Sequence, residues 1–321
     1  MKTVKIGLLG LGNVGSGTYR ILTENKEIIE KRTGCCPEVV KILQRNPGKK
    51  RLVDVDPSLL TEDPDHIIND PSIDIVVEMI GGIEPATSFM VQAMKAGKHV
   101  VSANKAAIAA NYRLLTNTAK EMGVEFLYEA SVAGGIPVLT SIEGALAANN
   151  FVEVMGILNG TTNYILTKMT EEGLAYDEVL KDAQAKGFAE ADPTADVEGI
   201  DAANKLSILM ALAFGKHIHP DSIPTVGITG VSADDIQAAA ESGKKIKLIG
   251  KASLRDGMVE YMVSPMLLDI NHPLAGVSNE FNAVYVTGEM VGELMFYGRG
   301  AGPLPTGSAV CGDIVSIMKK L

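Results

Sequence analysis

The sequence predicts an α/β protein with two domains, a parallel, doubly wound sheet followed by an α+β domain with a mixed sheet. The chain has 321 residues, which is enough for two hydrophobic cores. Short apolar runs alternate with helical stretches over the first half, which is typical of a parallel sheet. After residue 128 the chain turns to loops rich in glycine and small polar residues and then to longer β-type segments, so we place the domain boundary there.

The composition argues against several classes of protein. Hydrophobic residues make up 46% of the chain and charged residues 21%, as in ordinary globular proteins. The formal net charge of -10 argues against a nucleic acid or an anionic membrane as partner, because both require clustered Lys and Arg. The apolar run at 206–214 is shorter than the roughly 20 residues of a membrane span. Cys35, Cys36 and Cys311 have no C-x-x-C spacing, so we expect reduced thiols in a cytoplasmic protein.

The first element is a buried strand at 4–9 that leads into a glycine turn and a helix at 14–29. In the turn, Gly10 permits a tight bend, Gly12 lets the backbone approach a pyrophosphate, and Gly15 lets the helix pack on the strand. The N-terminus of the helix supplies N–H groups for the phosphates. A turn that is glycine-rich by chance is the alternative. The predicted cofactor-binding residues here are Gly10, Gly12, Asn13, Val14 and Gly15.

Later elements favour the dinucleotide-binding interpretation of this turn. Buried-type strands follow at 39–44, 74–80 and 99–104, with helical stretches at 85–96 and 111–122. Strands that alternate with helices form a parallel, doubly wound sheet of the Rossmann type.

The end of the second strand indicates which dinucleotide binds. An NAD site has an acidic residue there for the ribose 2′-hydroxyl, whereas this chain has Arg45, Asn46, Lys49 and Lys50. A guanidinium and ammonium groups suit a 2′-phosphate, and a charge-assisted hydrogen bond contributes about 1.5–3 kcal/mol. We therefore expect NADP to be preferred, with NAD also possible. A solvated basic loop is the alternative.

Two more loops follow strands of this sheet, where ligands of such folds bind. Gly81 and Gly82 follow one strand, and Ser102, Asn104 and Lys105 follow the next. Gly81, Ser102 and Lys105 are therefore further candidates for cofactor binding. Lys105 is placed to reach the nicotinamide or the substrate, or it is a surface lysine at the start of a helix.

The second half contains loops of the kind that approach a ligand or an ion. The segments 129–139 and 158–166 are rich in glycine and small polar residues, although Thr161 and Thr162 are also explained as helix caps. Three β-rich segments predict a mixed sheet with surface left over for a dimer contact. They are residues 246–254, 258–268 and 282–298.

An acidic stretch after residue 189 runs into an apolar helix with one lysine at the junction. Asp201 and Lys205 lie at i and i+4, on the same helical stripe as Ile208 and Leu212. Partial burial favours the neutral amine, whereas the carboxylate favours the ammonium, and this balance suits a group that exchanges a proton. A buried pair that only bridges elements is the alternative.

Elimination supports the lysine as the acid–base group. Two of the five histidines fall in the nucleotide half, two lie in a turn before Pro220 and one precedes Pro273, and no zinc motif occurs. A G-x-S-x-G nucleophile elbow is also absent from the sequence. A lysine therefore remains as the candidate acid–base group.

Motifs along the whole chain resemble those of one enzyme family. "GLGNVG", "SANKAAIA", "EASVAGGIP", "NGTTNYIL", "GFAEADPTADVEGIDAANK" and "GAGPLPTGSAV" occur in the same order as in homoserine dehydrogenases. That family reduces aspartate 4-semialdehyde to homoserine with NADPH or NADH, on the route to threonine and methionine. The resemblance covers essentially all 321 residues.

The resemblance implies a role for each candidate residue. Lys205 donates the proton with Asp201 beside it, and Lys105 is a second active-site lysine. Glu190 binds the substrate amino group. The substrate-binding set is Glu190, Asp201, Asp196, Gly160 and Thr161. Gly187 and Gly302 approach the cofactor. A site for sodium or another monovalent cation is implied by the carboxylate of Glu129 and the carbonyl groups of Val132, Gly134 and Ile136.

The resemblance also implies an architecture. A C-terminal helix at 303–321 returns to the NADP-binding domain of residues 1–128, and residues 129–302 form a catalytic and dimerisation domain. The implied assembly is a homodimer that acts on a small molecule.

Three departures from the family pattern matter. Many members continue into an amino-acid-binding ACT domain, whereas this chain stops at Leu321, so we expect a short form that threonine does not inhibit through such a domain. Phe188 stands where tyrosine is common. Asn46 replaces the usual acid after Arg45, which favours NADP further.

Two other classes of function use similar features. Aspartate-semialdehyde dehydrogenase also uses NADP but requires an acylated cysteine, and Cys311 lies in a C-terminal helix apart from any histidine. A catalytically silent NADP-binding sensor would not need Lys105, Asp201 and Lys205.

Overall fold

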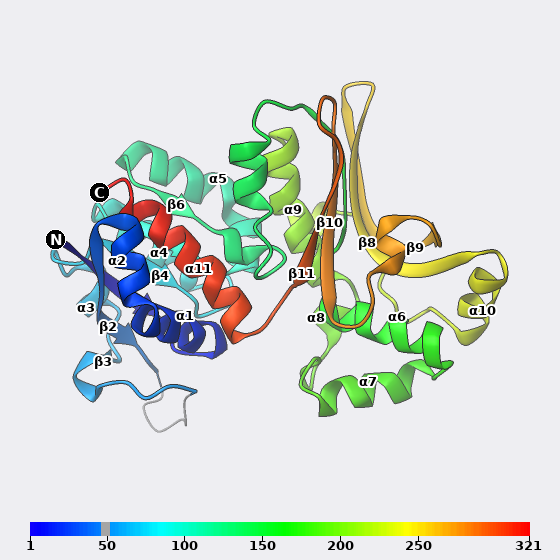
Figure 1. The fold of residues 1–321 in the computed structure, drawn as a ribbon, viewed down its shortest axis with the longest axis horizontal. Helices are drawn as coiled ribbons and strands as arrows, with labels where there is room; N and C mark the ends of the chain where they lie inside the picture. The colour runs from blue at the N-terminus through cyan, green and yellow to red at the C-terminus, as the bar shows by residue number, and fades with distance from the viewer. Residues whose placement is uncertain (46–51) are drawn as a thin grey trace. The chain divides into compact units, whose positions relative to one another are not determined.

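The computed structural model describes residues 1–45 and 52–321, which divide into two compact units. The first unit comprises Met1–Gly135 and Ala301–Leu321, and the second comprises Ile136–Gly300 (Figure 1). The C-terminal segment therefore belongs to the same unit as residues 1–135.

The first unit contains a six-stranded parallel sheet in the order β3-β2-β1-β4-β5-β6. The strands are β1 (Lys2–Leu9), β2 (Cys35–Leu43), β3 (Leu60–Thr61), β4 (Ile75–Glu78), β5 (His99–Ser102) and β6 (Phe126–Leu127). The strand order reverses between β1 and β4, which is the switch point where dinucleotides bind in Rossmann folds. The predicted α/β fold class is confirmed.

Helices connect and cover these strands. They are α1 (Asn13–Glu24), α2 (Lys26–Thr33), α3 (Asp65–Ile68), α4 (Ala86–Lys95), α5 (Lys105–Met122) and α11 (Pro303–Met318), with short helical turns η1 (Pro57–Leu59) and η2 (Glu129–Ser131). The single helix predicted at 14–29 is instead two helices, because the chain leaves helical geometry at Asn25.

The C-terminal helix α11 packs closely on α1. A Cβ atom at Gly17 would lie 1.9 Å from the carbonyl oxygen of Pro303, and one at Gly307 would lie 2.8 Å from the carbonyl carbon of Gly17. Glycine is therefore required on both helices. The buried side chains of α11 join the core of the parallel sheet, and they include Val310, Ile314 and Ile317.

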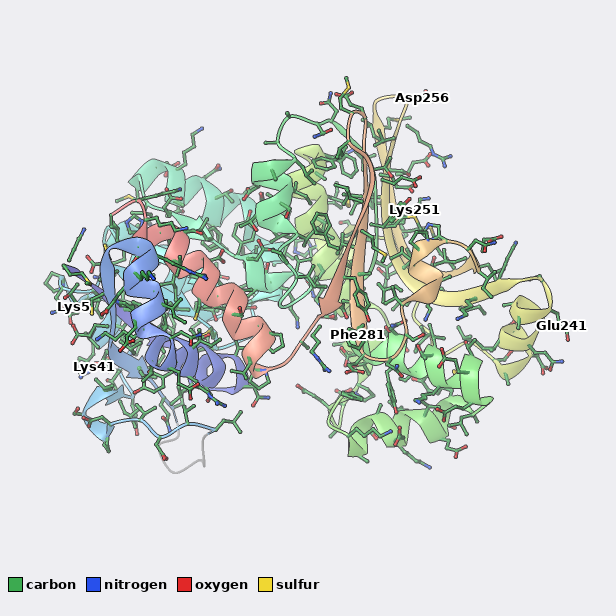
Figure 2. All side chains as sticks on the ribbon, viewed as in Figure 1. Lys5, Lys41, Glu241, Lys251, Asp256 and Phe281 are labelled. Atoms are coloured by element: carbon green, nitrogen blue, oxygen red, sulfur yellow. The ribbon has the colours of Figure 1, made fainter. Side chains whose placement is uncertain are left out.

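The second unit contains a five-stranded sheet in the order β11-β10-β7-β8-β9. The strands are β7 (Phe151–Ile157), β8 (Lys244–Arg255), β9 (Met258–Asp269), β10 (Phe281–Gly288) and β11 (Gly292–Arg299). All four pairings within it are antiparallel. The sheet is therefore antiparallel and not mixed as predicted, and parallel pairing among the described residues of this unit is limited to one isolated bridge between Thr225 and Val263. Asp256 marks the tip of the β8–β9 hairpin (Figure 2).

Helices cover one face of this sheet, and α9 and α6 pack against its central strands. The helices are α6 (Gly160–Glu172), α7 (Tyr176–Ala185), α8 (Thr194–Val197), α9 (Ile200–Phe214) and α10 (Ala233–Glu241), with turns η3 (Ser141–Ala145), η4 (Pro220–Ser222) and η5 (Pro273–Gly276). The predicted apolar helix is α9, and its Leu206, Ile208 and Leu209 are fully buried.

A row of side chains runs across the other face of the sheet. Met295, Tyr285, Met155, Lys251 and Met262 are successive cross-strand partners, so all five point to the same side. Met262 is 40% exposed and Met295 is 41% exposed, whereas Tyr285 and Met155 at the centre of the row are buried. We call this row the open sheet face, and Lys251 marks it on β8 (Figure 2).

Candidate active site

The glycine turn after β1 has the geometry that a dinucleotide site needs. Gly10 has a φ of +112°, and a Cβ atom there would lie 3.0 Å from the carbonyl oxygen of Met79. A Cβ atom at Gly15 would lie 2.4 Å from the carbonyl oxygen of Gly10, whereas one at Gly12 would meet nothing within 4 Å. The side of Gly12 is therefore open to an incoming phosphate.

The N-terminus of α1 is suited to the same phosphate. Gly12 is its N-cap residue and provides no side-chain cap, and no acidic residue lies in the first turn. The first N–H groups of the helix and its dipole therefore favour an anion here. Asn13 and Val14 are the first two residues of the helix, which was predicted to begin at Val14. Arg45 is exposed just after β2, whereas Asn46, Lys49 and Lys50 lie outside the described residues.

The loop after β5 is tied to the loop after β4. The Ser102 hydroxyl donates to Oε2 of Glu78 at 2.7 Å, and Nδ2 of Asn104 donates to the carbonyl oxygen of Gly82 at 2.7 Å. Gly81 has a φ of +78°. Lys105 is the first residue of α5, where a cation opposes the helix dipole, so helix stability does not explain its position.

In the second unit, Lys205 is buried beside Asp201 on α9. The Nζ atom of Lys205 donates to Oδ2 of Asp201 at 2.6 Å and to the carbonyl oxygen of Leu158 at 2.6 Å. The two side chains are only 9% and 6% exposed. Because desolvating two charges offsets most of their attraction, such a pair is poorly explained by stability alone.

A residue that the sequence analysis did not select, Asn159, joins the acidic groups. Its Nδ2 atom donates to Oδ1 of Asp196 at 2.7 Å and to Oδ2 of Asp201 at 2.9 Å. Its Oδ1 atom accepts from the N–H of Thr162 at 2.9 Å and so caps α6. Burial, together with the neighbouring charge of Asp201, raises the pKa of Asp196, although the bond from Asn159 opposes this.

Asn282 on β10 also supports this group and was not selected from the sequence. Its Nδ2 atom donates to the carbonyl oxygen of Leu158 at 2.9 Å, so that this oxygen accepts from both Asn282 and Lys205. A Cβ atom at Gly300 would lie 2.1 Å from Cγ of Asn282, so only glycine leaves room for the amide.

The other predicted substrate residues lie on α6 or before α8. Gly160 and Thr161 open α6, and a Cβ atom at Gly160 would lie 2.7 Å from the carbonyl oxygen of Glu280. The Thr161 hydroxyl donates to the carbonyl oxygen of Phe188 at 2.7 Å. Glu190 is exposed. The prediction that Thr161 and Thr162 cap a helix is wrong, because the helix already begins at Gly160.

The glycines predicted to approach the cofactor lie in different units. Gly187 follows α7 in the second unit with a φ of +75°, and Gly302 is the N-cap of α11 in the first unit with a φ of +118°. These dihedral angles are strained for residues with a side chain.

The predicted cation loop has an unusual backbone. Ala133 and Gly134 have φ angles of +55° and +57°, and Ala133 is fully buried. Successive left-handed residues change the direction of their carbonyl groups sharply, and such strain in a buried non-glycine residue is typical of functional sites. Glu129 is also buried, and its N–H donates to Oδ2 of Asp313 at 2.9 Å. Val132 lies in the same loop, and Ile136 begins the second unit.

No group of three or more His, Cys, Asp or Glu residues with metal-site geometry occurs in the part of the chain that the structure describes. A cation at this loop would therefore depend mainly on carbonyl oxygens.

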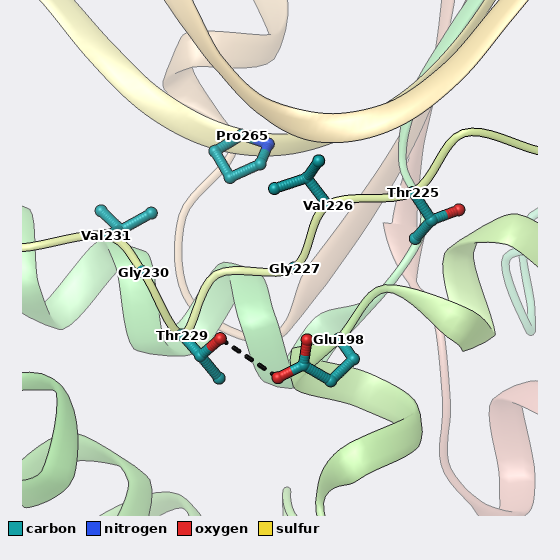
Figure 3. Close-up of a pocket in the computed structure, with 8 residues that line it drawn as sticks. All are labelled: Glu198, Thr225, Val226, Gly227, Thr229, Gly230, Val231 and Pro265. Carbon is teal, nitrogen blue, oxygen red and sulfur yellow. Dashed lines mark hydrogen bonds between the residues drawn. The ribbon is translucent and has the colours of Figure 1, made fainter.

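The second unit has a surface pocket (Figure 3). It is lined by Glu198, Thr225, Val226, Gly227, Thr229, Gly230, Val231 and Pro265. Its one charged group, Glu198, accepts a hydrogen bond from the Thr229 hydroxyl at 3.1 Å. None of the predicted catalytic or substrate residues lines this pocket.

Comparison with known proteins decides the family. A family model for the NAD-binding domain of homoserine dehydrogenase matches residues 10–129, and one for homoserine dehydrogenase matches residues 137–315. The chain belongs to the homoserine dehydrogenase family. The homoserine dehydrogenase of Bacillus subtilis is 46% identical over 321 residues, which are 100% of this chain and 74% of the relative. The predicted family and its nicotinamide cofactor are thereby confirmed.

Solved structures of the family have the same fold. A homoserine dehydrogenase from Thiobacillus denitrificans superimposes with a TM-score of 0.94 at 43% identity, covering 99% of this chain and 74% of that one. A hyperthermophilic archaeal homoserine dehydrogenase in complex with NADPH has a TM-score of 0.83 at 27% identity, covering 99% of this chain and 98% of that one. Within the described residues, no helix combines the length and apolar character that crossing a membrane requires.

Proposed function

We propose that this homoserine dehydrogenase reversibly reduces L-aspartate 4-semialdehyde to L-homoserine, prefers NADPH, and serves threonine and methionine biosynthesis. The observation that supports the chemistry most strongly is the buried pair of Lys205 and Asp201, with the Leu158 carbonyl as a second acceptor. An ammonium held by two acceptors in a nearly dry site is suited to giving a proton to a developing alkoxide.

The proton transfer follows from this geometry. When bound, the cofactor supplies the hydride that forms the new C–H bond of the alcohol. As the carbon–oxygen double bond becomes a single bond, Lys205 gives one proton to the oxygen and becomes a neutral amine. Asp201 orients the Nζ atom and stabilises its charged form before the transfer. In the reverse direction the neutral amine accepts the proton of the hydroxyl group.

Acidic residues match the amino group of the substrate. We place the α-ammonium group of the substrate near Glu190 and Asp196, with Gly160 and Thr161 lining the same site. Asn159 supports this placement because it holds Asp196 and Asp201 through one side-chain amide. Lys105, at the start of α5, is the second active-site lysine of the proposal.

The preference for NADPH rests on the basic loop. Arg45 follows β2, where an acidic residue would favour NAD. We expect Arg45→Ala to lower kcat/KM for NADPH by about tenfold while leaving that for NADH unchanged. Equal catalytic efficiencies with the two cofactors, unaffected by this change, would contradict the preference.

We also propose a sodium ion, or another monovalent cation, at the loop that contains Glu129, Val132, Gly134 and Ile136. The left-handed backbone at Ala133 and Gly134 and the oxygen-rich donor set support it. Titration with NaCl, at ionic strength held constant with tetramethylammonium chloride, should raise the thermal stability of the protein. Equal stability in the two salts would contradict the cation site.

We also propose that the protein is a homodimer and is located in the cytoplasm. The open sheet face presents partly exposed Met262 and Met295, which a second copy would bury. The three cysteines are free thiols, as expected in a reducing compartment. Sedimentation at micromolar concentration should show a dimer, and Met295→Arg should dissociate it.

The alternative of an aspartate-semialdehyde dehydrogenase is disfavoured by Cys311. Burial raises the pKa of this thiol to about 12, so it is a poor nucleophile. Its Sγ atom instead faces the carbonyl oxygen of Thr18 at 3.7 Å.

One assay separates the two enzymes. With aspartate 4-semialdehyde and NADPH alone, a homoserine dehydrogenase consumes NADPH and forms homoserine, and thiol alkylation has no effect. The alternative enzyme would instead form NADPH from NADP and the semialdehyde, only with added phosphate. Repeating the first assay with NADH, and then with threonine, measures cofactor preference and inhibition.

A further inference from the structure

Glu78 is a buried carboxylate that the proposed mechanism does not use. It is the last residue of β4, beside β1, and therefore lies at the switch point of the parallel sheet. Its side chain is fully buried. A carboxylate in such a place has lost its hydration, so the protein must provide hydrogen bonds in return.

The donors to Glu78 come from the two loops that are predicted to bind the cofactor. Oε1 accepts from the N–H of Ile80 at 2.8 Å and from Nδ2 of Asn104 at 3.4 Å. Oε2 accepts from the Ser102 hydroxyl at 2.7 Å. One carboxylate thus joins the turn after β4 to the turn after β5.

A second set of bonds makes this connection rigid. Asn104 also donates to the carbonyl oxygen of Gly82 at 2.7 Å, and its N–H donates to the Ser102 hydroxyl oxygen at 3.1 Å. The same Asn104 caps α5 through the N–H of Ala107. Glu78 therefore lies at the centre of a network that sets both loops and the start of the helix that carries Lys105.

Electrostatics indicate that the carboxylate is not placed here for stability. Burial raises the pKa of Glu78, and the hydrogen bonds from Ser102, Ile80 and Asn104 act in the opposite direction. An apolar residue at the end of a buried strand would not lose hydration as a charge does and would need no hydrogen bonds in return. The network is explained better by the shape that it gives to the two loops.

We propose that Glu78 is a positioning residue for the nicotinamide cofactor, which fixes the 79–82 and 102–105 turns in the shape that receives it. The inference rests on the proposed function in one respect, because it takes these two turns as cofactor-binding. Glu78 acts through the loops and does not itself touch the reacting atoms.

Two substitutions distinguish the effect of Glu78 on the shape of the loops from the effect of its charge. In Glu78→Gln, the amide oxygen still accepts from Ile80 and Asn104, and the new amide N–H donates to the Ser102 oxygen, so the loops keep their shape without the charge. In Glu78→Ala, all three donors lose their acceptor. A positioning role predicts that glutamine is tolerated and alanine is not.

Asp74 offers a matched control at the other end of β4. Its Oδ2 atom accepts from the N–H of Lys5 at 2.8 Å, so it is also an acidic side chain that bonds to the sheet backbone. Asp74→Ala removes a comparable hydrogen bond in the same unit and leaves both cofactor loops intact.

The experiment measures NADPH and NADP affinity by fluorescence titration and calorimetry in the wild type and the three variants. We expect Glu78→Ala to weaken both cofactors by about tenfold or more, Glu78→Gln by less than about threefold, and Asp74→Ala not at all.

Several results would overturn the inference. The first is that folded Glu78→Ala binds the cofactor with wild-type affinity. The second is that Glu78→Gln loses as much cofactor affinity as Glu78→Ala, which would show that the charge of Glu78 causes the effect. If Glu78→Ala does not fold, Ser102→Ala should still weaken NADPH binding by about threefold, and wild-type affinity in that variant would contradict the proposal. A wild type that binds NADPH but does not reduce the semialdehyde refutes only the proposed function.

Discussion

Lys205 and Lys247 are both buried in the second unit, but they have different partners. The Nζ atom of Lys205 pairs with a carboxylate, Asp201. The Nζ atom of Lys247, on β8, donates to Oδ1 of Asn163 at 3.0 Å and to the carbonyl oxygen of Val277 at 2.7 Å, both of which are neutral. Burial accordingly lowers the pKa of Lys247 to about 8.

The difference shows that burial alone does not identify a catalytic lysine. Asn163, the acceptor for Lys247, also donates to the carbonyl oxygens of Val277, Asn279 and Phe281 at 3.2, 2.9 and 3.1 Å. Lys247 therefore helps to hold a loop on α6 and is a structural group. Lys205 instead lies beside the acidic cluster that is predicted to bind substrate, and in the proposed mechanism its partner Asp201 keeps a proton available for transfer.

The largest effect is expected for Lys205→Ala, because it removes the proton donor. We expect kcat to fall by about a hundredfold to ten-thousandfold with NADPH affinity unchanged, as measured by steady-state kinetics and fluorescence titration. Lys247→Met is the matched control and should retain kcat within about threefold. Near-normal turnover of Lys205→Ala would remove the basis of the proposed mechanism.

The second prediction concerns stability and pH. Because the pKa of Lys247 is about 8 in the folded protein and 10.5 is its ordinary value, the unfolded chain binds more protons between these pH values. The free energy of unfolding should therefore rise with pH across this window, by up to about 3 kcal/mol. Urea unfolding of the wild type and of Lys247→Met isolates this contribution, since the variant should lack it. Identical slopes in the two proteins would show that folding does not lower the pKa of Lys247.

A third pair of variants tests the two supporting amides. Asn282→Ala removes a donor from the carbonyl group that orients Lys205, so we expect kcat to fall by about tenfold with little change in NADPH affinity. Asn163→Ala removes an acceptor of Lys247, so we expect a loss of about 2 kcal/mol of stability and near-normal kcat. Chemical denaturation and steady-state kinetics on both variants measure these effects. A loss of kcat in Asn163→Ala, together with a loss of stability only in Asn282→Ala, would contradict the roles assigned to the two lysines.

The smallest effect concerns Asp196. Because burial and Asp201 raise its pKa, this carboxyl group takes up a proton at a higher pH than an ordinary aspartic acid. The substrate ammonium loses a charged partner as pH falls through the raised pKa, so KM for the semialdehyde should increase on the acid side. Asp196→Asn should raise KM by about three- to tenfold and remove the increase of KM at acidic pH. A wild-type pH profile in this variant would exclude Asp196 from the substrate site.

The sequence predicted the features that depend on neighbours in the chain. The spacing of Gly10, Gly12 and Gly15 is local, and so is the i, i+4 relation of Asp201 and Lys205, which the structure bears out at 2.6 Å. Turn and helix geometry is set largely by such short-range patterns.

The sequence does not predict the features that depend on contacts between residues far apart in the chain. Asn282 is 124 residues from Leu158 in the chain, and nothing near it in the sequence indicates the bond between them. The sequence gives no signal for Glu78 for the same reason, because its donors Ser102 and Asn104 lie at the end of another strand and in the loop after it. The acidic stretch after residue 189 forms α8 and does not run directly into the apolar helix, because Gly199 between them has a φ of +82°, and a Cβ atom there would lie 2.9 Å from Cγ2 of Thr225.

Chemical rescue of Lys205→Ala by small primary amines tests the central claim most directly. If Lys205 donates the proton, the cavity left by alanine should accept methylammonium, and added methylamine should restore turnover in a saturable manner with no change in NADPH affinity. Lys247→Met should show no such response. A folded Lys205→Ala protein that binds NADPH and stays inactive at every amine concentration would contradict the account.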